Sequence, residues 1–211
     1  MKKIINIIFS LCFSILIIIG VIKFTVGFKP LYYYDVDELN IVELTNISKE
    51  DIKLNYDYLI EYITSKKEND FEMPTLTSSK EGKIHFEEVR EIYQNVNKIF
   101  NVCLIISVLG IVYNIRNKNI RFLNLTSILL IIMPVALAIP IVIDFDSSFV
   151  VFHKLLFDND YWIFDPILDP VIKILPAEFF MNSGLMILGL ILASSIIIQG
   201  IYRLLKRKRE Q

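Results

Sequence analysis

The sequence predicts an all-α membrane protein with four transmembrane helices and a mainly helical extracellular cap. Hydrophobic residues make up 54% of the 211 residues, and the mean hydropathy is +0.52. The apolar residues gather in four runs, each close to the roughly 20 residues that a helix needs to cross a bilayer. Three clusters of basic residues flank these runs on the same side, which predicts that both termini lie in the cytoplasm (N-in, C-in). At this length we expect a single membrane domain.

The predicted transmembrane helices span residues 4–26, 98–115, 122–143 and 183–203. The remaining parts are an outer cap segment (27–97), a cytoplasmic loop (116–121), an outer interfacial segment (144–182) and a basic cytoplasmic tail (204–211). The first run follows two lysines, as in a signal peptide, but it is longer than the apolar region of such a peptide and no A-x-A-like cleavage site follows. We therefore expect it to remain as an anchor.

The charged residues predict the orientation and exclude one class of function. Short basic flanks lie at Lys2-Lys3, between Arg116 and Arg121, and between Arg203 and Arg209, and four crossings place all three in the cytoplasm. Of the 23 acidic residues, 22 fall in the two predicted outer segments. The chain has 22 Lys and Arg and 23 Asp and Glu, so it lacks the excess of basic residues that is typical of a nucleic-acid-binding protein. We expect any chemistry in the membrane or on its outer face.

Two helix starts are predicted in the outer cap segment. The stretch Ser48 to Asp51 resembles a capping box with Asp in place of Glu, and Ser78 to Glu81 is a second start signal. The first helix has an apolar face at helical spacing, formed by Ile52, Tyr56, Leu59, Ile60 and Ile63. The second leads into the span 98–115 and carries a stripe of His85, Val89, Ile92, Val96 and Ile99. His85 is therefore expected on a packed face. We interpret Tyr32, Tyr33 and Tyr34 as an interfacial aromatic belt.

The second outer segment is too apolar for a solvated loop. Its stretch Phe149 to Phe157 is too short to span a bilayer, so we interpret it as an interfacial or re-entrant helix that ends before Asp158-Asn159-Asp160. Tyr161-Trp162 then supplies aromatic residues suited to the headgroup level. Asp165-Pro166 and Asp169-Pro170 have the cap-and-proline pattern that starts short helices.

The chain has only two histidines, His85 and His153, one in each outer segment. A single histidine in such a position is more often a packing residue than a catalytic one. Two histidines on the same side of the membrane, with no others in the chain, support a catalytic pair and a packing role about equally. Zinc is less well supported, because there is no H-E-x-x-H motif and both cysteines, Cys12 and Cys103, lie in predicted spans. G-x-S-x-G, P-loop and G-x-G-x-x-G motifs are absent, so no nucleotide, metal or other cofactor is expected.

Several stretches, together with the four spans and the large first outer segment, resemble the lipoprotein intramolecular transacylase family. They are Tyr58 to Tyr62 (YLIEY), Ile84 to Arg90 (IHFEEVR), Phe152 to Phe157 (FHKLLF), Asn159 to Trp162 (NDYW) and Asp169-Pro170. The resemblance covers nearly the whole chain, and the two histidine-containing stretches are its most specific parts. Glu88 stands where the family pattern usually has Asp.

The resemblance implies an acyltransferase of the bacterial cell membrane that acts on its extracellular face. Its partners would be membrane lipid and diacylated lipoproteins, whose N-terminal cysteine carries a diacylglyceryl thioether. The sn-2 acyl chain would move to the α-amine of that cysteine and leave a lyso-form (N-acyl, S-monoacylglyceryl) lipoprotein. Because this amine is mostly protonated at neutral pH, a base must first take its proton, and a histidine is well matched to do so.

The implied site comprises the two histidines and a few neighbours. We assign His153 as the base and His85 as its partner, with the reverse assignment left open. Glu88 is a candidate to orient His85, and Asn159 or Tyr161 a candidate to stabilise the oxyanion. Phe152, Phe157 and Trp162 are the expected contacts with lipid. The alternative is a non-enzymatic membrane sensor or assembly subunit with an acidic extracellular cap, in which both histidines only pack or sense pH.

Overall fold

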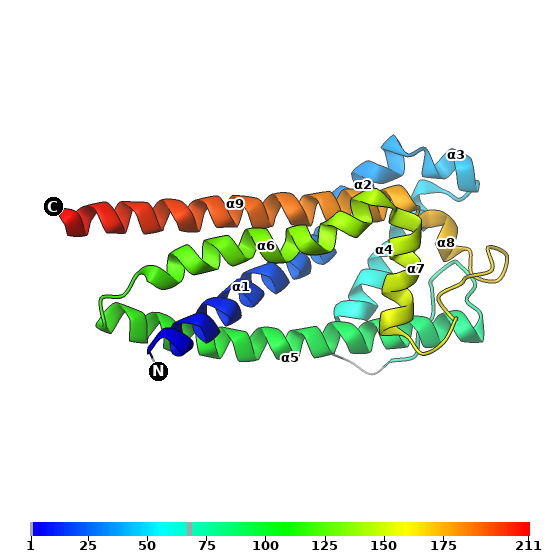
Figure 1. The fold of residues 1–211 in the computed structure, drawn as a ribbon. Coiled ribbons are helices and arrows are strands. Elements are labelled where there is room, and N and C mark those ends of the chain that lie inside the picture. The colour runs from blue at the N-terminus through cyan, green and yellow to red at the C-terminus, as the bar shows by residue number, and fades with distance from the viewer. Residues whose placement is uncertain (1, 67–68) are drawn as a thin grey trace. The chain divides into compact units, whose positions relative to one another are not determined.

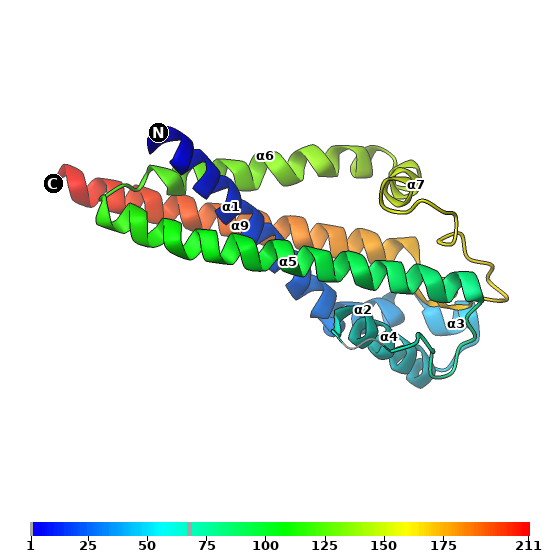
Figure 2. The ribbon, with the colours of Figure 1, turned by 90° about the horizontal axis from the view of Figure 1, so that it is seen from below.

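The computed structural model describes residues 2–66 and 69–211. All regular secondary structure in this part of the chain is helical, which confirms the predicted all-α class (Figure 1). The helices are α1 (Lys2–Gly27), α2 (Lys29–Glu38), α3 (Ile41–Thr45), α4 (Lys49–Thr64), α5 (Lys80–Arg116), α6 (Arg121–Ile143), α7 (Phe145–Leu156), α8 (Val171–Ile174) and α9 (Ala177–Glu210). Figure 2 shows that α5 and α9 are each continuous along their length.

The chain divides into two compact units. The membrane unit comprises Met1–Phe24, Val96–Ile143 and Leu185–Gln211, and the cap unit comprises Thr25–Asn95 and Asp144–Gly184. Each predicted span lies inside one of the four long helices, α1, α5, α6 and α9. Helix α9 continues beyond its predicted span, through residues 204–210 of the predicted cytoplasmic tail.

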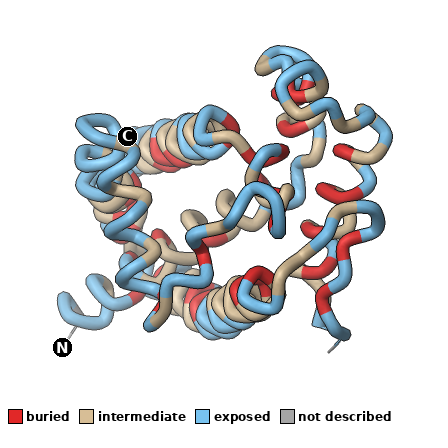
Figure 3. The backbone as a smooth tube through the Cα atoms, turned by 90° about the vertical axis from the view of Figure 1, so that its right-hand side faces the viewer, coloured by how far each residue is buried: buried red, intermediate tan, exposed pale blue. Residues whose placement is uncertain are grey.

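Four described helices are long and apolar enough to cross a membrane, which confirms the expected number of spans. Few of their side chains are buried inside the protein, and exposed and intermediate residues predominate along the backbone in Figure 3. Large apolar side chains such as Ile105, Leu137 and Ile196 are instead exposed. An exposed apolar surface of this extent is stable in lipid rather than in water. The protein is therefore a multi-pass membrane protein.

Small polar residues join the helices of the membrane unit. Ser195 Oγ–H on α9 donates to the carbonyl of Ser127 on α6 at 2.7 Å, and Ser127 Oγ–H donates to Gln199 Oε1 at the same distance. Between α1 and α5, the ring of Phe9 packs so closely on Gly110 that a Cβ there would lie 1.9 Å from a ring carbon. Such small residues and interhelical hydrogen bonds are typical of helix packing in membranes.

The core of the cap unit is aromatic. Tyr32 on α2 is fully buried, stacks on Tyr56 of α4 with ring centroids 3.6 Å apart, and donates its hydroxyl to the Ile174 carbonyl at 2.7 Å. The prediction that Tyr32 belongs to an interfacial aromatic belt is therefore wrong. Successive residues of a helix point about 100° apart, so the three tyrosines do not share a face. Tyr33 donates to Asp57 at 2.6 Å, and Tyr34 alone is well exposed.

Both predicted helix starts in the cap unit are confirmed. Ser48 Oγ accepts from the Asp51 N–H at 3.0 Å at the start of α4, and Ile52, Tyr56 and Leu59 on its expected apolar face are buried. Ser79 Oγ accepts from the Gly82 N–H at 2.9 Å at the start of α5. These local hydrogen bonds satisfy backbone donors that have no partner in the first turn of a helix.

The second outer segment follows the expectation in part. Helix α7 covers the apolar stretch 149–156, with Asp144 as its N-cap, and ends before Phe157. After Asp165-Pro166, however, the chain forms a turn in which the Asp165 carboxylate accepts from the Ile167 N–H, so no helix starts there. Helix α8 does follow Pro170, but the Asp169 side chain does not cap it. The Asp169 carboxylate binds Ser79 instead.

Candidate functional site

The two histidines meet inside the cap unit. His85 lies in the second turn of α5 and His153 near the end of α7, and their ring centroids are 6.1 Å apart. The long helix α5 positions the first ring and the short apolar helix α7 the second. At this distance both imidazoles can reach one small group between them, as an acid–base pair must.

Aromatic rings surround both histidines. His85 has as neighbours, by the distance between ring centroids, Phe157 (4.7 Å), Phe164 (5.4 Å) and Phe86 (5.5 Å). His153 has Phe149 (4.0 Å), Trp162 (4.8 Å), Phe152 (5.6 Å) and Phe157 (5.7 Å). Phe157 therefore contacts both imidazoles. An aromatic enclosure of this kind excludes water and strengthens electrostatic interactions inside it.

The enclosure keeps both histidines neutral. His85 is only 5% exposed, and its burial, together with the neighbouring His153, lowers the pKa of His85 to about 4. Burial also lowers the pKa of His153, and its hydrogen bond to the Phe149 carbonyl opposes this effect. Desolvation disfavours the imidazolium form of each ring. At neutral pH each imidazole can therefore accept a proton, and each has one N–H to donate.

A hydrogen bond assigns the tautomer of His153. Its Nδ1 lies 2.7 Å from the carbonyl oxygen of Phe149, one helical turn earlier. A carbonyl can only accept, so Nδ1 carries the hydrogen in the neutral ring and Nε2 carries the lone pair. The Nδ1 of His85, by contrast, is buried with no protein partner. The lone pair of His153 that can accept a proton is therefore on Nε2.

The carboxylate of Glu88 binds Asn159. Asn159 Nδ2 donates to Glu88 Oε1 at 2.7 Å, and Asn159 Oδ1 accepts from the Tyr161 N–H at 3.0 Å. The sequence led us to expect Glu88 to orient His85, but the carboxylate instead fixes the loop that follows α7. Its other oxygen, Oε2, is buried without a protein partner. Tyr161 contributes its backbone N–H, while its side chain is 38% exposed.

The three aromatic residues expected at the lipid interface lie in different environments. Phe152 is 57% exposed, whereas Phe157 and Trp162 are buried against the histidines. Sequence reasoning missed Phe164, which packs on both His85 and Phe86, and it did not single out Phe149 as the partner of His153. The spacing of Phe149 and His153, four residues apart on one helix, was an available signal for the latter contact.

Within residues 2–66 and 69–211, no group of three or more His, Cys, Asp or Glu side chains could hold a metal ion. Two cavities of about 450 and 370 Å³ lie in the membrane unit, the first between α6 and α9 beside Ser127 and Arg203. Neither is lined by a histidine. The polar and aromatic contacts of the histidines, rather than these cavities, therefore define the candidate active site.

Comparisons with known proteins show the family of the chain. The family model described as "Lipoprotein intramolecular transacylase Lit" matches residues 7–180. A solved structure of the membrane integral lipoprotein intramolecular transacylase Lit from Bacillus cereus is 42% identical, with a TM-score of 0.95, and the match covers 100% of this chain and 99% of that one.

Structures of the Bacillus cereus protein with the H85R and H85A mutations match with TM-scores of 0.92. Their sequences are 41% and 42% identical to this chain. Each match covers 100% of this chain, and the matches cover 94% and 96% of the mutant chains. No curated protein matches the chain. On the evidence of the family model and of these structures, the chain belongs to the lipoprotein intramolecular transacylase family and is an acyltransferase of the membrane.

Proposed function

We propose that His85 and His153 catalyse transfer of the sn-2 acyl chain of a diacylglyceryl-modified lipoprotein to the α-amine of its N-terminal cysteine. The product is the lyso-form lipoprotein. The observation that carries the proposal is the meeting of the two histidines, held neutral in an aromatic enclosure, with ring centroids 6.1 Å apart. The non-enzymatic alternative has no comparable support, because the family is one of transferases.

The reaction needs proton transfer and close approach. The cysteine α-amine has a reference pKa of about 7.7 to 8.0, so it must lose a proton before it attacks the ester carbonyl. A carbon–nitrogen bond then forms, the ester carbon–oxygen bond breaks, and the released glyceryl oxygen takes up a proton. Direct attack closes a ring of about eight atoms, so holding the substrate in this geometry is a large part of the enzyme's task.

The tautomer of His153 supports its role as the base. With Nδ1–H donated to the Phe149 carbonyl, its Nε2 lone pair is available to take the proton from the amine. The low pKa of His85, about 4, suits a neutral imidazole that donates an N–H to the ester oxygen as negative charge develops there. A neutral imidazole is a known electrophilic catalyst in other enzymes, where the surroundings also lower its pKa.

Asn159 is the stronger of the two oxyanion candidates. One N–H of its amide is bound by Glu88, and its oxygen accepts from the backbone of Tyr161, so the side chain is held in one orientation. The second N–H of the same amide would then stabilise the tetrahedral intermediate. On this proposal Glu88 and Tyr161 act through Asn159. Phe152, which is well exposed, would contact the acyl chains or membrane lipid.

We place the reaction at the extracellular face of the bacterial cell membrane. The bias of basic residues toward the opposite flanks of the spans supports this orientation. The diacylated lipoprotein is anchored in the same leaflet, so donor and acceptor groups reach the site together. No nucleotide or other cofactor enters the proposed chemistry.

Mass spectrometry of a lipoprotein N-terminus tests the proposal. Cells or membranes with this protein should yield the lyso-form, and His85→Gln or His153→Gln should lower its formation by about 100-fold or more. Each variant is compared at equal amount and equal melting temperature. Normal lyso-form production by both glutamine variants would reject the catalytic roles, and its absence with the parent protein would reject the reaction itself.

A further inference from the structure

We propose that Asp169 is a positioning residue, which holds the first turns of α5, and with them His85, against the segment 157–169. We call the contact of Asp169 with Ser79 and Gly82 the Asp169 clasp. This inference rests on the proposed histidine chemistry. It concerns a residue that touches neither histidine and that acts on the reaction only through the placement of His85.

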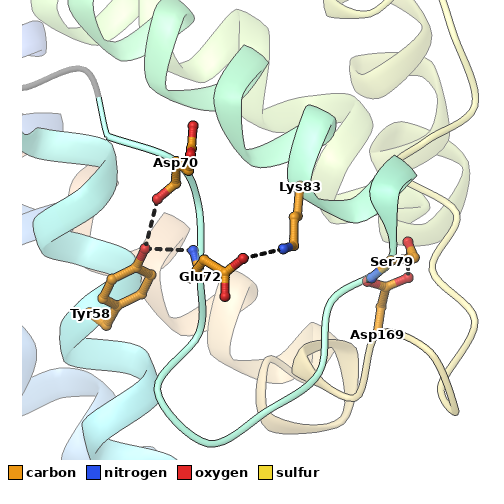
Figure 4. Close-up of polar contacts among 6 residues, drawn as sticks. All are labelled: Tyr58, Asp70, Glu72, Ser79, Lys83 and Asp169. Atoms are coloured by element: carbon orange, nitrogen blue, oxygen red, sulfur yellow. Dashed lines mark hydrogen bonds and ion pairs between the residues drawn. The ribbon is translucent and has the colours of Figure 1, made fainter.

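Both carboxylate oxygens of Asp169 bind the residue that caps α5. Oδ1 accepts from the Ser79 N–H at 2.8 Å, and Oδ2 accepts from the Ser79 hydroxyl at 2.7 Å (Figure 4). Asp169 is only 4% exposed, so these bonds are protected from water. Hydrogen bonds to an ionised acceptor are about twice as strong as neutral ones. The carboxylate also faces the N-terminal end of a 37-residue helix, where negative charge is favourable.

The neighbouring glycine makes room for the clasp. A Cβ at Gly82 would lie 2.3 Å from Asp169 Oδ1 and 2.9 Å from its Cγ. No glycine described here has a positive φ, so space and not backbone conformation requires glycine at this position. A glycine inside a helix is less favourable than alanine, because it loses more backbone conformational freedom on folding. The close approach of the carboxylate explains why α5 carries one in its first turn.

The clasp lies one turn before the site on α5. Ser79, Gly82, His85 and Glu88 follow one another at intervals of three residues, so each is a neighbour of the next, about 60° further around the helix. All four contact the segment 157–169, since Phe157 and Phe164 pack on His85 and Asn159 binds Glu88. Along α5, a polar contact thus lies on each side of His85: that of Ser79 with Asp169 before it and that of Glu88 with Asn159 after it. Thr77 adds a hydrogen bond to the Leu168 carbonyl at 3.1 Å.

This arrangement predicts a kinetic effect of a particular kind. Releasing the clasp frees the start of α5 to shift or tilt, while the aromatic walls that receive the substrate stay in place. A misplacement of about 1 Å at a reacting group can cost about 100-fold in rate. The effect should therefore fall on kcat, with KM nearly unchanged, and it should be recovered by a side chain that restores the hydrogen bonds.

The test is a double-mutant cycle on the full-length protein in detergent, with a synthetic diacylglyceryl-cysteine lipopeptide as substrate. Asp169→Ala removes the carboxylate, and Gly82→Ala displaces it without changing any charge. We expect each to lower kcat by about 10- to 100-fold. The double variant should cost no more than the worse single one, because both changes break the same contact. Asp169→Asn keeps an acceptor for the Ser79 N–H and should recover much of the rate.

Glu72→Gln is the matched control. It removes the ion pair of Glu72 with Lys83, which lies on the same turn of α5 as Gly82 but on the surface (Figure 4). Exposed ion pairs contribute little, so this variant should keep the parent rate. A loss as large as that of Asp169→Ala would show that any perturbation of this turn suffices, and it would overturn the proposal.

Other outcomes also decide between the two proposals. Strictly additive losses in the cycle would overturn the positioning role, and so would a rise in KM with kcat unchanged. It would also be overturned if the rate lost in Asp169→Asn and Gly82→Ala were fully explained by a smaller fraction of folded protein. His85→Gln is run in the same assay. If His85→Gln remained fully active, the histidine chemistry would fail, whereas an inactive His85→Gln beside a fully active Asp169→Ala would reject the clasp alone.

Discussion

At the scale of single residues, His85 and His153 illustrate how burial changes the properties of a titratable group. Neither ring has a carboxylate partner among the described hydrogen bonds, and both have a lowered pKa. A backbone carbonyl binds Nδ1 of His153, where a catalytic triad would have a carboxylate, and aromatic rings surround His85. Burial makes the charged imidazolium costly, so each ring rests in the neutral form, which can accept a proton.

The lowered pKa of His85 predicts a pH dependence of stability. Between pH 6.5 and about 4, the unfolded chain binds a proton at this residue that the folded protein does not bind. The stability contributed by neutral His85 is therefore fully present above pH 6.5 and is lost as the pH falls toward 4. Melting temperatures measured across this range should fall less steeply for His85→Gln than for the parent. Equal slopes would contradict the buried neutral state.

The two histidines should also behave as one catalytic unit. We expect His85→Gln and His153→Gln combined to lower the rate little more than the worse single variant, because groups that act together are strongly non-additive. Single-turnover rates of lyso-form production provide the measurement. Fully multiplicative losses would instead indicate that each ring contributes independently.

At the scale of elements, the loop after α7 is tied to α5 by a polar contact. Asn159 binds Glu88 across the site, next to the ring of Phe157 that touches both histidines. The short helix α7 carries His153 and ends at this loop. Placement of His153 relative to His85 thus depends on this one donor–acceptor pair as well as on aromatic packing.

Exchanging the donor and the acceptor of this pair tests its role. Asn159→Asp places two carboxylates against each other and should lower the rate by about 10- to 100-fold. Adding Glu88→Gln restores one donor and one acceptor with the same total charge, since Gln can donate to the new carboxylate. We expect the double variant to regain the melting temperature lost in Asn159→Asp but not the parent rate, because an ionised carboxylate has no N–H to stabilise the tetrahedral intermediate. A double variant with the parent rate would reject the oxyanion role of Asn159.

At the scale of the whole molecule, the orientation in the membrane remains a prediction from charge. In a background with Cys12→Ser and Cys103→Ala, cysteines placed at Asn69 or Asp160 should react with an impermeant thiol reagent on intact cells. Cysteines at Lys118 or Arg209 should react only after the membrane is opened, because the basic flanks stay in the cytoplasm. The reverse pattern would invert the topology and place the site on the inner face.

Much of the fold could be predicted because its signals are local. Four apolar runs identify the spanning helices, and Ser48 and Ser79 mark helix starts through hydrogen bonds within one turn. In lipid, the backbone N–H and C=O groups of a spanning segment must hydrogen-bond to one another within the helix. The hydropathy of the sequence therefore nearly determines that such a segment is helical and where it begins and ends. The two histidines could be selected from the sequence because no other residue of that type is present.

Contacts between residues far apart in the chain could not be predicted. The sequence by itself determined the all-α class, the number of spans and the candidate histidines. Only the tertiary structure decided that Tyr32 is buried, that Glu88 binds Asn159, and that Asp169 binds Ser79 instead of capping its own helix. Helical periodicity and caps are set within a few residues, whereas the partner of a buried polar side chain depends on which distant segment packs against it and leaves it no access to water.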